Sequence, residues 1–292
     1  MRVTDRLVFD NAARDTARAR TAATEASSQA STGTRINHPS DDPAAAGMIQ
    51  SFQMSGARFA AIGQAAGLAS DELTAVDGAL DSIATAVSRA SELAVQFSNS
   101  TYTASQRAGG ALEVGTIIDQ VTSLLNTKFG NRFLFGGTKD DSAPFDPTGN
   151  YLGDGGVREV EIAPGVRQQS NVLVGGMGAG TPGSLMAVLG ALRTALTAND
   201  VPGVTTTLGG LAAGTDAVAN TRAQVGASMH AFDTAVTASK VATDSQQNEA
   251  SKLGEVDLVQ ASIQLQATQT ALQASLSAAA QSFRLTLLDY LK

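Results

Sequence analysis

Residues 48–97 read MIQSFQMSGARFAAIGQAAGLASDELTAVDGALDSIATAVSRASELAVQF, and the apolar spacing in this stretch decides the fold. Steps of alternately four and three residues from Met48 reach a series of positions of which only Ser55 is polar. A period of 3.5 residues that lasts for seven heptads is typical of a coiled-coil helix, whose apolar stripe stays aligned with a partner. At about 1.5 Å per residue the helix would be roughly 75 Å long, so we predict a long paired helix. The positions are Met48, Phe52, Ser55, Phe59, Ile62, Ala66, Ala69, Leu73, Val76, Leu80, Ile83, Val87, Ala90, Ala94 and Phe97.

Further helical segments supply partners for this helix. We predict a turn over residues 100–110, then a second helix that ends near Gly130, because glycine readily adopts the left-handed conformation of a helix cap. Helical spacing returns after the middle of the chain, with a predicted break at residues 201–204. A polar stretch, residues 238–257, is expected to separate this arm from a last helix. The apolar positions of these helices are Val114, Ile118, Val121 and Leu125; Leu185, Val188, Leu189, Leu192 and Leu196; Leu211, Val218, Val225 and Phe232; and Leu258, Leu265, Leu272 and Ala279.

The middle of the chain has a different character. Glycine and proline accumulate in residues 131–183, where residues 157–162 alternate apolar and charged residues as a half-buried strand does. Residues 171–176 and 133–137 are two further candidates for short strands. We therefore predict a mainly α fold, with a long antiparallel coiled-coil rod formed by the N- and C-terminal halves. A small β-rich insert is expected at the distal end of the rod.

Composition narrows the classes of function. Aromatic residues are only 4% and Trp is absent, so the 43% hydrophobic content is mainly Ala, Leu and Val, which suits close-packed helices. A net charge of -7 without a long basic run argues against a nucleic-acid partner. No window is long and apolar enough for insertion in a membrane, and the start lacks the apolar core of a signal peptide. Because there is no Cys, disulfides and zinc-thiolate sites are excluded.

The stretch RINHPSDDPAAAG, residues 35–47, contains residue types that could form a metal or acid/base site. The only other histidine, His230, lies on the return arm, and no metal-binding motif accompanies His38. A helix boundary explains the residues more simply, because Asp42 can cap a helix whose first residue is Pro43, and Asp41 favours the positive end of its dipole. The preceding helix is expected to stop at His38, since a proline follows. We predict no catalytic residue, metal or cofactor here.

The last helix carries an apolar stripe that widens towards the chain end. An exposed apolar face of several hundred Å² is rare on a soluble monomer, so this helix needs a partner. We expect the two termini to pair with each other and with neighbouring subunits, and to be disordered when the protein is alone. The stripe consists of Leu272, Leu276, Phe283, Leu285, Leu287, Leu288 and Leu291.

Three motifs together resemble a known family. QASTGTRINHPSDDPAAAG is similar to the N-terminal motif shared by flagellins and the hook-filament junction proteins of bacterial flagella. NRFLFGGTKDDSAPFD, residues 131–146, resembles an element typical of the junction proteins, the hook-associated protein 3 family of the flagellin superfamily. The ending TQTALQASLSAAAQSFRLTLLDYL resembles the C-terminal helix of the same group. The motifs lie at both ends and at the entry to the insert, in the same order as in the family.

The resemblance implies a division of the chain into three domains. Residues 1–40 with 255–292 would be terminal helices of an inner tube, residues 41–130 with 184–254 a helical rod domain, and residues 131–183 a surface insert. The implied assembly and partner contacts are Arg35, Asn37, Asp41, Asp42, Leu272, Leu276, Phe283, Leu287, Leu288 and Leu291.

The resemblance also implies a role and partners. The protein would be a structural adaptor, without enzymatic activity, that forms a ring at the hook-filament junction and assembles by coupled folding and association of its terminal helices. Its partners would be hook-associated protein 1, flagellin, neighbouring copies of itself and an export chaperone on the C-terminal helix. It would reach the outside of the cell through the flagellar type III export channel.

Three alternatives remain open at this point. A filament-forming flagellin would share the terminal motifs but polymerise by itself. A surface adhesin would bind through residues 131–183, and an enzyme could occupy the same insert. The insert contains no His, which argues against a zinc protease in it.

Overall fold

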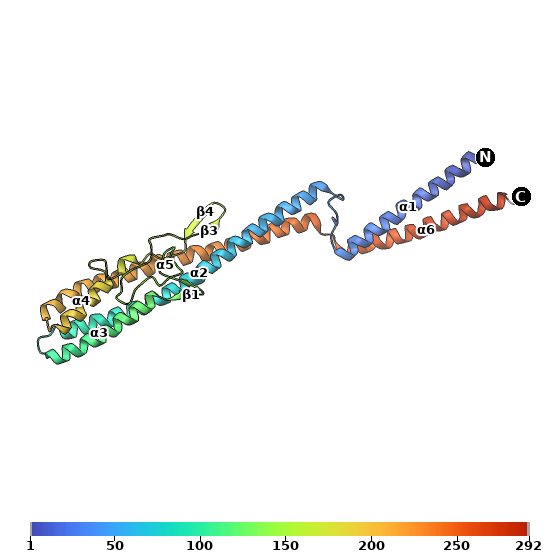
Figure 1. Ribbon diagram of the computed structural model, residues 1–292. Coiled ribbons are helices and arrows are strands. Elements are labelled where there is room, and N and C mark those ends of the chain that lie inside the picture. The colour runs from blue at the N-terminus through green and yellow to red at the C-terminus, as the bar shows by residue number, and fades with distance from the viewer. Residues whose placement is uncertain (1, 291–292) are drawn as a thin grey trace. The chain divides into compact units, whose positions relative to one another are not determined.

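The computed structural model describes residues 2–290, and the side chains of residues 7, 9–174 and 176–281. The chain divides into a terminal unit, Met1–Arg58 with Ala242–Lys292, and a bundle unit, Phe59–Val241. Figure 1 labels most of the elements. They are α1 (Arg2–Thr32), α2 (Pro43–Phe97), α3 (Ala104–Leu125), β1 (Lys128–Phe129), β2 (Arg132–Phe133), β3 (Glu159–Ala163), β4 (Val166–Gln169), the 3-10 turn η1 (Gly175–Met177), α4 (Leu185–Thr197), α5 (Val201–Gly254) and α6 (Leu258–Tyr290). The mainly α fold with a small β-rich insert is confirmed.

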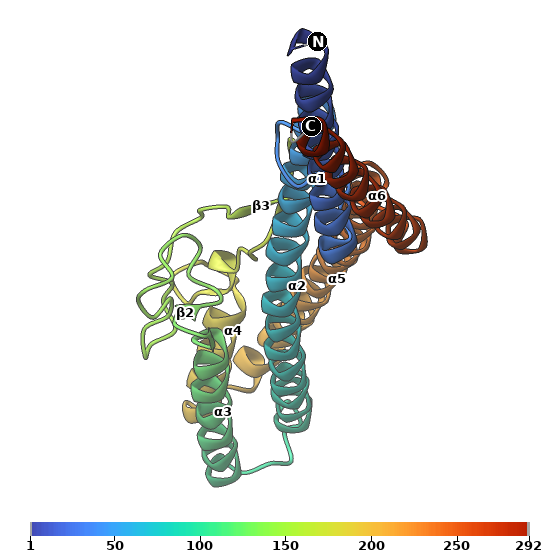
Figure 2. The same cartoon turned by 90° about the vertical axis from the view of Figure 1, so that its right-hand side faces the viewer.

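The bundle unit contains four antiparallel helical segments, from α2, α3, α4 and α5 (Figure 2). Polar contacts fix the pairing of α2 with α5, since Arg222 Nε donates to Asp77 Oδ1 at 2.8 Å and Ser70 Oγ donates to Asp233 Oδ1 at 2.8 Å. The α2 residue number rises from 70 to 77 while its α5 partner falls from 233 to 222. The predicted antiparallel pairing of the two arms is therefore present in this unit.

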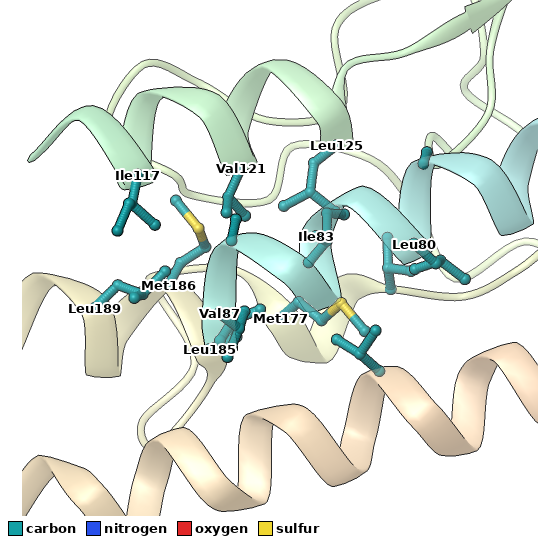
Figure 3. Close-up of a cluster of buried hydrophobic side chains, with 14 of the residues drawn as sticks. Leu80, Ile83, Val87, Ile117, Val121, Leu125, Met177, Leu185, Met186 and Leu189 are labelled. Atoms are coloured by element: carbon teal, nitrogen blue, oxygen red, sulfur yellow. The ribbon is translucent and has the colours of Figure 1, made fainter. Parts of the chain in front are cut away.

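The apolar stripes of the four helices meet in one core. Figure 3 shows Leu80, Ile83 and Val87 of α2 lying against side chains of α3 and α4. The predicted α2 stripe is fully buried from Ile62 onwards, but Met48, within the terminal unit, is 46% exposed. The contact face of α2 is shifted by one position there. The side chain of Ile49, and not that of Met48, lies 3.2 Å from where a Cβ on Gly254 of α5 would be, and Ala45 is buried.

Two predicted breaks lie elsewhere than expected. α3 begins at Ala104, inside the predicted turn, because Thr103 and Gln106 form a capping box that starts the helix early. α5 begins at Val201, inside the predicted break at residues 201–204. Proline is tolerated in a first helical turn, and Asp200 Oδ1 accepts a hydrogen bond from Gly203 N at 3.1 Å.

The polar stretch 238–257 was predicted to separate α5 from α6, and this is wrong for most of its length. α5 continues to Gly254, so only residues 255–257 lie between the two helices. Gln, Lys and Glu are good helix formers, and the loss of an apolar stripe therefore does not end a helix. Similarly, α1 ends at Thr32 and not at His38, because Gly33 adopts a left-handed conformation with φ 70°.

A buried arginine connects the two inter-helix turns at one end of the bundle unit. Arg107 is 3% exposed, and its guanidinium donates to the carbonyl oxygens of Phe97, Asn99 and Tyr102 at 2.8–3.1 Å. It also donates to Asn199 Oδ1 at 2.6 Å, which joins the α2–α3 turn to the α4–α5 turn. Four oxygen atoms thus replace water around a charge that would otherwise be costly to bury.

The insert between α3 and α4 lies on one side of the bundle (Figure 2). It packs beside the middle of α2 and α5, because the paired helices extend past it to the turns at residues 98–103 and 198–200. Its β1 and β2 strands form a short hairpin around Gly130, which has φ 60° and therefore serves this turn and not the cap of α3. α3 ends instead at Leu125.

One of the three strand candidates in the insert is confirmed, by β3. Residues 134–137 and 171–174 are irregular, although both were predicted to contain strands. All of their large apolar side chains except Leu173, which is exposed, are buried in the helical core, so their hydrophobicity reflects packing against helices and not pairing in a sheet. The insert residues in the hydrophobic core are Leu134, Phe135, Phe145, Val172, Val174 and Met177.

In the terminal unit, α1 and α6 form an antiparallel pair (Figure 1). Leu258 at the start of α6 lies 3.9 Å from where a Cβ on Gly33, just after α1, would be, and Leu272 lines a groove with Arg20 and Ala23. Among the described side chains, the buried apolar residues of this unit are all alanines: Ala23, Ala26, Ala45, Ala250 and Ala261. None of the helices, as far as they are described, is long and apolar enough to cross a membrane.

Candidate functional site

The two connections in the terminal unit, α1 to α2 and α5 to α6, lie side by side. Val256 N donates to Gly33 O at 3.0 Å, and Arg35 N donates to Gly254 O at 2.7 Å. The Arg35 guanidinium extends this contact, because Nη2 donates to Leu253 O at 3.0 Å. A positive side chain at the C-terminal end of α5 also interacts favourably with the helix dipole.

Arg35 also reaches the start of α2. Its Nη1 lies 3.4 Å from Asp42 Oδ2, while Asp42 Oδ1 accepts from Ala45 N at 3.0 Å. This is the predicted N-cap, with Pro43 as the first helical residue. The hydrogen bond from Ala45, with that from Arg35, lowers the pKa of Asp42. Arg35 thus connects the end of one long helix with the beginning of the other.

Asp41 has a role different from the predicted one. Its Oδ2 accepts from His38 N at 2.8 Å and from Asn37 N at 3.1 Å, and the bond from His38 is the main cause of its lowered pKa. The carboxylate therefore folds the turn that precedes α2. Whether its charge also favours the positive end of the α2 dipole stays a prediction.

Asn37 ties the same turn to α1. Its Oδ1 accepts from Thr32 Oγ1 at 2.9 Å and from Thr34 Oγ1 at 2.6 Å, and its Nδ2 donates to Ser28 Oγ at 3.1 Å. Ser28 and Thr32 could not be predicted as partners from the sequence, because serine and threonine are frequent throughout this helix and no motif distinguishes these two positions.

A polar cleft of about 430 Å³ lies between this turn and α1. It is lined by Arg35, Asn37, His38, Asp41 and Asp42 together with residues of α1. The four predicted contact residues of the first linker are therefore in one place. Among the described residues, no cluster of three or more His, Asp or Glu side chains could hold a metal ion.

The predicted contacts on α6 are described only in part. Leu272 is half-buried in the groove beside α1, and Leu276 is 51% exposed. The side chains of Phe283, Leu287 and Leu288, and the whole of Leu291, lie outside the described residues. Three further exposed apolar residues at the start of α6 were not predicted as contacts: Leu258, Val259 and Ile263.

α6 is also free of charge over most of its length. Residues 258–283 contain no Asp, Glu, Lys or Arg, and are composed of Ala, Ser, Thr, Gln and large apolar residues. Charged residues are depleted at the centre of protein–protein interfaces. A long uncharged helix with exposed leucine and isoleucine is therefore suited to contact with other protein surfaces.

Family models match both halves of the chain. The model for the N-terminal helical region of bacterial flagellin matches residues 6–140, and the model for the C-terminal helical region matches residues 210–291. The chain belongs to the flagellin family. The two matched regions contain α2, α3 and α6 and most of α1 and α5. The larger part of the insert and α4 lie between them.

Two relatives of this chain share one name with each other. Flagellar hook-associated protein 3 of Salmonella typhimurium is 33% identical over 153 residues, which are 52% of this chain and 47% of the relative. Flagellar hook-associated protein 3 of Escherichia coli is 35% identical over 127 residues, 43% of this chain and 40% of the relative. The matched segments span less than half the length of either relative.

A similar fold is present in a solved structure. A flagellar hook-associated protein from Vibrio parahaemolyticus superposes with a TM-score of 0.67 at 20% identity, over 74% of this chain and the whole of that chain. At this identity the likeness concerns the fold alone.

Proposed function

We propose that this protein is a structural part of the bacterial flagellum, the adaptor at the junction of hook and filament. The observation that carries the proposal is its 33–35% identity to two proteins named Flagellar hook-associated protein 3. We expect it to form a ring on which flagellin polymerises, with hook-associated protein 1 on the hook side. No enzymatic activity is expected.

The proposed mechanism is coupled folding and association of the terminal helices. The large buried side chains lie in the bundle unit, whereas the described core of the terminal unit contains only alanines. Each alanine buries little apolar area, so the α1–α6 pair gains little stability from its own packing. Neighbouring copies would cover the exposed apolar residues of α6 and supply the missing burial.

In the proposed assembly, residues 1–40 and 255–292 form the inner tube, residues 41–130 with 184–254 the rod domain, and residues 131–183 the surface insert. The linker with Arg35 and Asp42 would be the spoke between inner and outer tubes, because it joins the ends of α2 and α5 to the terminal pair. The contacts we propose on the C-terminal side are Leu272, Leu276, Phe283, Leu287, Leu288 and Leu291.

Export belongs to the same proposal. A chaperone would cover the apolar stripe of the C-terminal helix before secretion. The protein would then leave the cell unfolded through the flagellar type III channel. It would then fold at the tip of the hook, outside the cell.

Deletion of the gene tests the role directly. We expect cells with intact hooks but without filaments, and flagellin shed into the medium. Normal filaments on the deletion strain would refute the proposal. Complementation with Arg35→Ala, Asp42→Ala and the double variant then tests the linker. Wild-type swimming of the double variant would exclude these residues as assembly contacts.

A filament-forming flagellin is the second candidate, since both family models are named for flagellin. A flagellin forms long filaments from purified protein, whereas a junction protein stays monomeric without its partners. Electron microscopy and light scattering of the concentrated purified protein decide between the two functions.

A further inference from the structure

The β3–β4 hairpin depends on the helices beneath it. Its strands pair with each other in a two-stranded sheet, with Val160 opposite Gln168. A two-stranded hairpin alone is marginally stable in water. Its contacts with α2 and α5 therefore decide whether it keeps its place.

The apolar part of these contacts is small. Val160 and Ile162 are partly buried against the core of the bundle unit, and Gln168 Nε2 donates to Ser228 Oγ of α5 at 3.3 Å. The opposite face carries Glu159 and Arg167, whose side chains are largely exposed. One face of the hairpin thus rests on the helices while the other meets solvent.

A buried carboxylate on α2 provides the polar anchor. The Glu72 side chain is 8% exposed, and it accepts a hydrogen bond from Arg158, which directly precedes β3. Arg158 Nη1 also donates to Asp140 Oδ2 at 3.3 Å. Arg132 Nη2 approaches Glu72 Oε2 at 3.4 Å, but Arg132 is about half exposed, so its contribution is screened by water.

This network holds two positive and two negative side chains, and Arg158 is the buried countercharge of Glu72. Removal of one member of a buried ion pair leaves the other charged and poorly solvated, which is strongly unfavourable. The Arg158 side chain can relieve this cost by rotating into water. Its backbone stays bound, because Arg158 N donates to Asn171 Oδ1 at 2.9 Å and its carbonyl oxygen accepts from Ser170 N at 2.8 Å. Glu72 has no such freedom, because its helix is fixed by the core.

We propose that the β3–β4 hairpin is a strap over α2 and α5, and that the ion pair between Glu72 and Arg158 is the latch that holds it closed. Loss of the latch releases the hairpin and exposes Val160 and Ile162, while the helical core stays folded. The core survives because its large side chains come from the helices and from insert segments outside the hairpin.

Hydrogen exchange of the full chain carrying Glu72→Gln tests the latch. Backbone amides of residues 159–169 should exchange at least about tenfold faster, while amides of α5 between Leu211 and Val225 keep their wild-type rates. Glu113→Gln is the matched control, because it removes an exposed carboxylate that pairs with Arg89 on the same bundle. Unchanged exchange of the hairpin in Glu72→Gln would overturn the proposal, and so would equal loss of protection in α5.

Arg158→Gln provides an independent variant on the hairpin side and leaves Glu72 paired with Arg132. It should accelerate exchange of the hairpin as Glu72→Gln does, and the combined variant should show no larger effect, since both substitutions open one latch. Additive effects would mean that the two residues act separately, which contradicts the proposal.

A thiol probe gives a second readout, because the chain has no Cys. Ile162→Cys places one thiol on the partly buried face of the strap. Its labelling should accelerate when Glu72→Gln is added and stay the same when Glu113→Gln is added. Equal labelling rates in the two double variants would refute the latch.

Discussion

Leu276→Ala should weaken assembly of the protein onto hooks. Leu276 lies on α6 and is 51% exposed, so about half of its apolar surface remains to be covered. Complete burial of a leucine side chain is worth about 1.5–3 kcal/mol, so coverage of the exposed half contributes roughly 0.8–1.5 kcal/mol for each subunit. We therefore expect an apparent dissociation constant about 4- to 12-fold higher for association with hooks.

The assay uses hooks isolated from a strain that lacks the protein. Purified variant is titrated onto these hooks, and the bound fraction is measured by quantitative blotting. Thermal unfolding of the bundle unit in the free variant should match that of the wild type, because Leu276 lies in the terminal unit. Leu112→Ala is the control, because Leu112 is an equally apolar residue that is 77% exposed on α3, outside the terminal unit.

Two results would refute this reasoning. Half-saturation of Leu276→Ala at the wild-type concentration would mean that neighbours do not cover this part of α6. An equal loss of affinity in Leu112→Ala would mean that exposed leucines of the bundle unit contribute as much as those of the terminal helices.

Three other predictions concern the bundle unit. Phe232→Ala removes a fully buried ring and should lower the free energy of unfolding by about 3–5 kcal/mol, measured by urea denaturation. Gly110→Ala places a methyl group 2.2 Å from the ring of Phe97, so calorimetry should show a lower Tm and a loss of about 1–3 kcal/mol. Hydrogen bonds, chiefly from Thr138, lower the pKa of Asp154 to about 2. The carboxylate therefore stabilises the fold above its unfolded pKa of about 4, and this contribution is lost as the pH falls towards 2. Asp154→Asn should reduce the slope of unfolding free energy against pH in that range; an unchanged slope would count against it.

The long helices were predictable because their apolar positions repeat without interruption. From Ile62 to Phe97 the predicted stripe is the observed core, and Leu211, Val218, Val225 and Phe232 are buried as expected. The spacing cannot show, however, where the contact face shifts by one position. Met48 was therefore predicted on the contact face, although Ile49 is the residue that lies against α5.

Helix ends and the insert were predicted less well, because they depend on capping contacts and on packing against distant residues. Three stretches predicted as breaks are rich in glycine, proline or polar residues, which are compatible with both turns and helices: residues 100–110, 201–204 and 238–257. Capping side chains decide which of the two forms. In the insert, the apolar residues Phe135 and Val172 face a helical core that the local sequence does not reveal. An apolar run between turn residues therefore looks like a strand even where no sheet exists.

The linker was predicted in part. Asp42 was identified as a helix cap because its position before a proline is distinctive. Besides Asp42, the partner of the Arg35 guanidinium is the backbone carbonyl of Leu253, more than 200 positions further along the chain. No residue type at the end of α5 predicts this contact. A contact made by a backbone carbonyl does not depend on the residue type, so a single sequence cannot predict it.

The uncharged stretch of α6 has a consequence for the conditions under which the protein associates. Without Asp, Glu, Lys or Arg in residues 258–283, this part of the helix has no side-chain charges for dissolved ions to screen. Contacts made by this stretch should therefore not weaken when salt screens charges. An appendage built on such contacts would not loosen on passing from fresh water into brine.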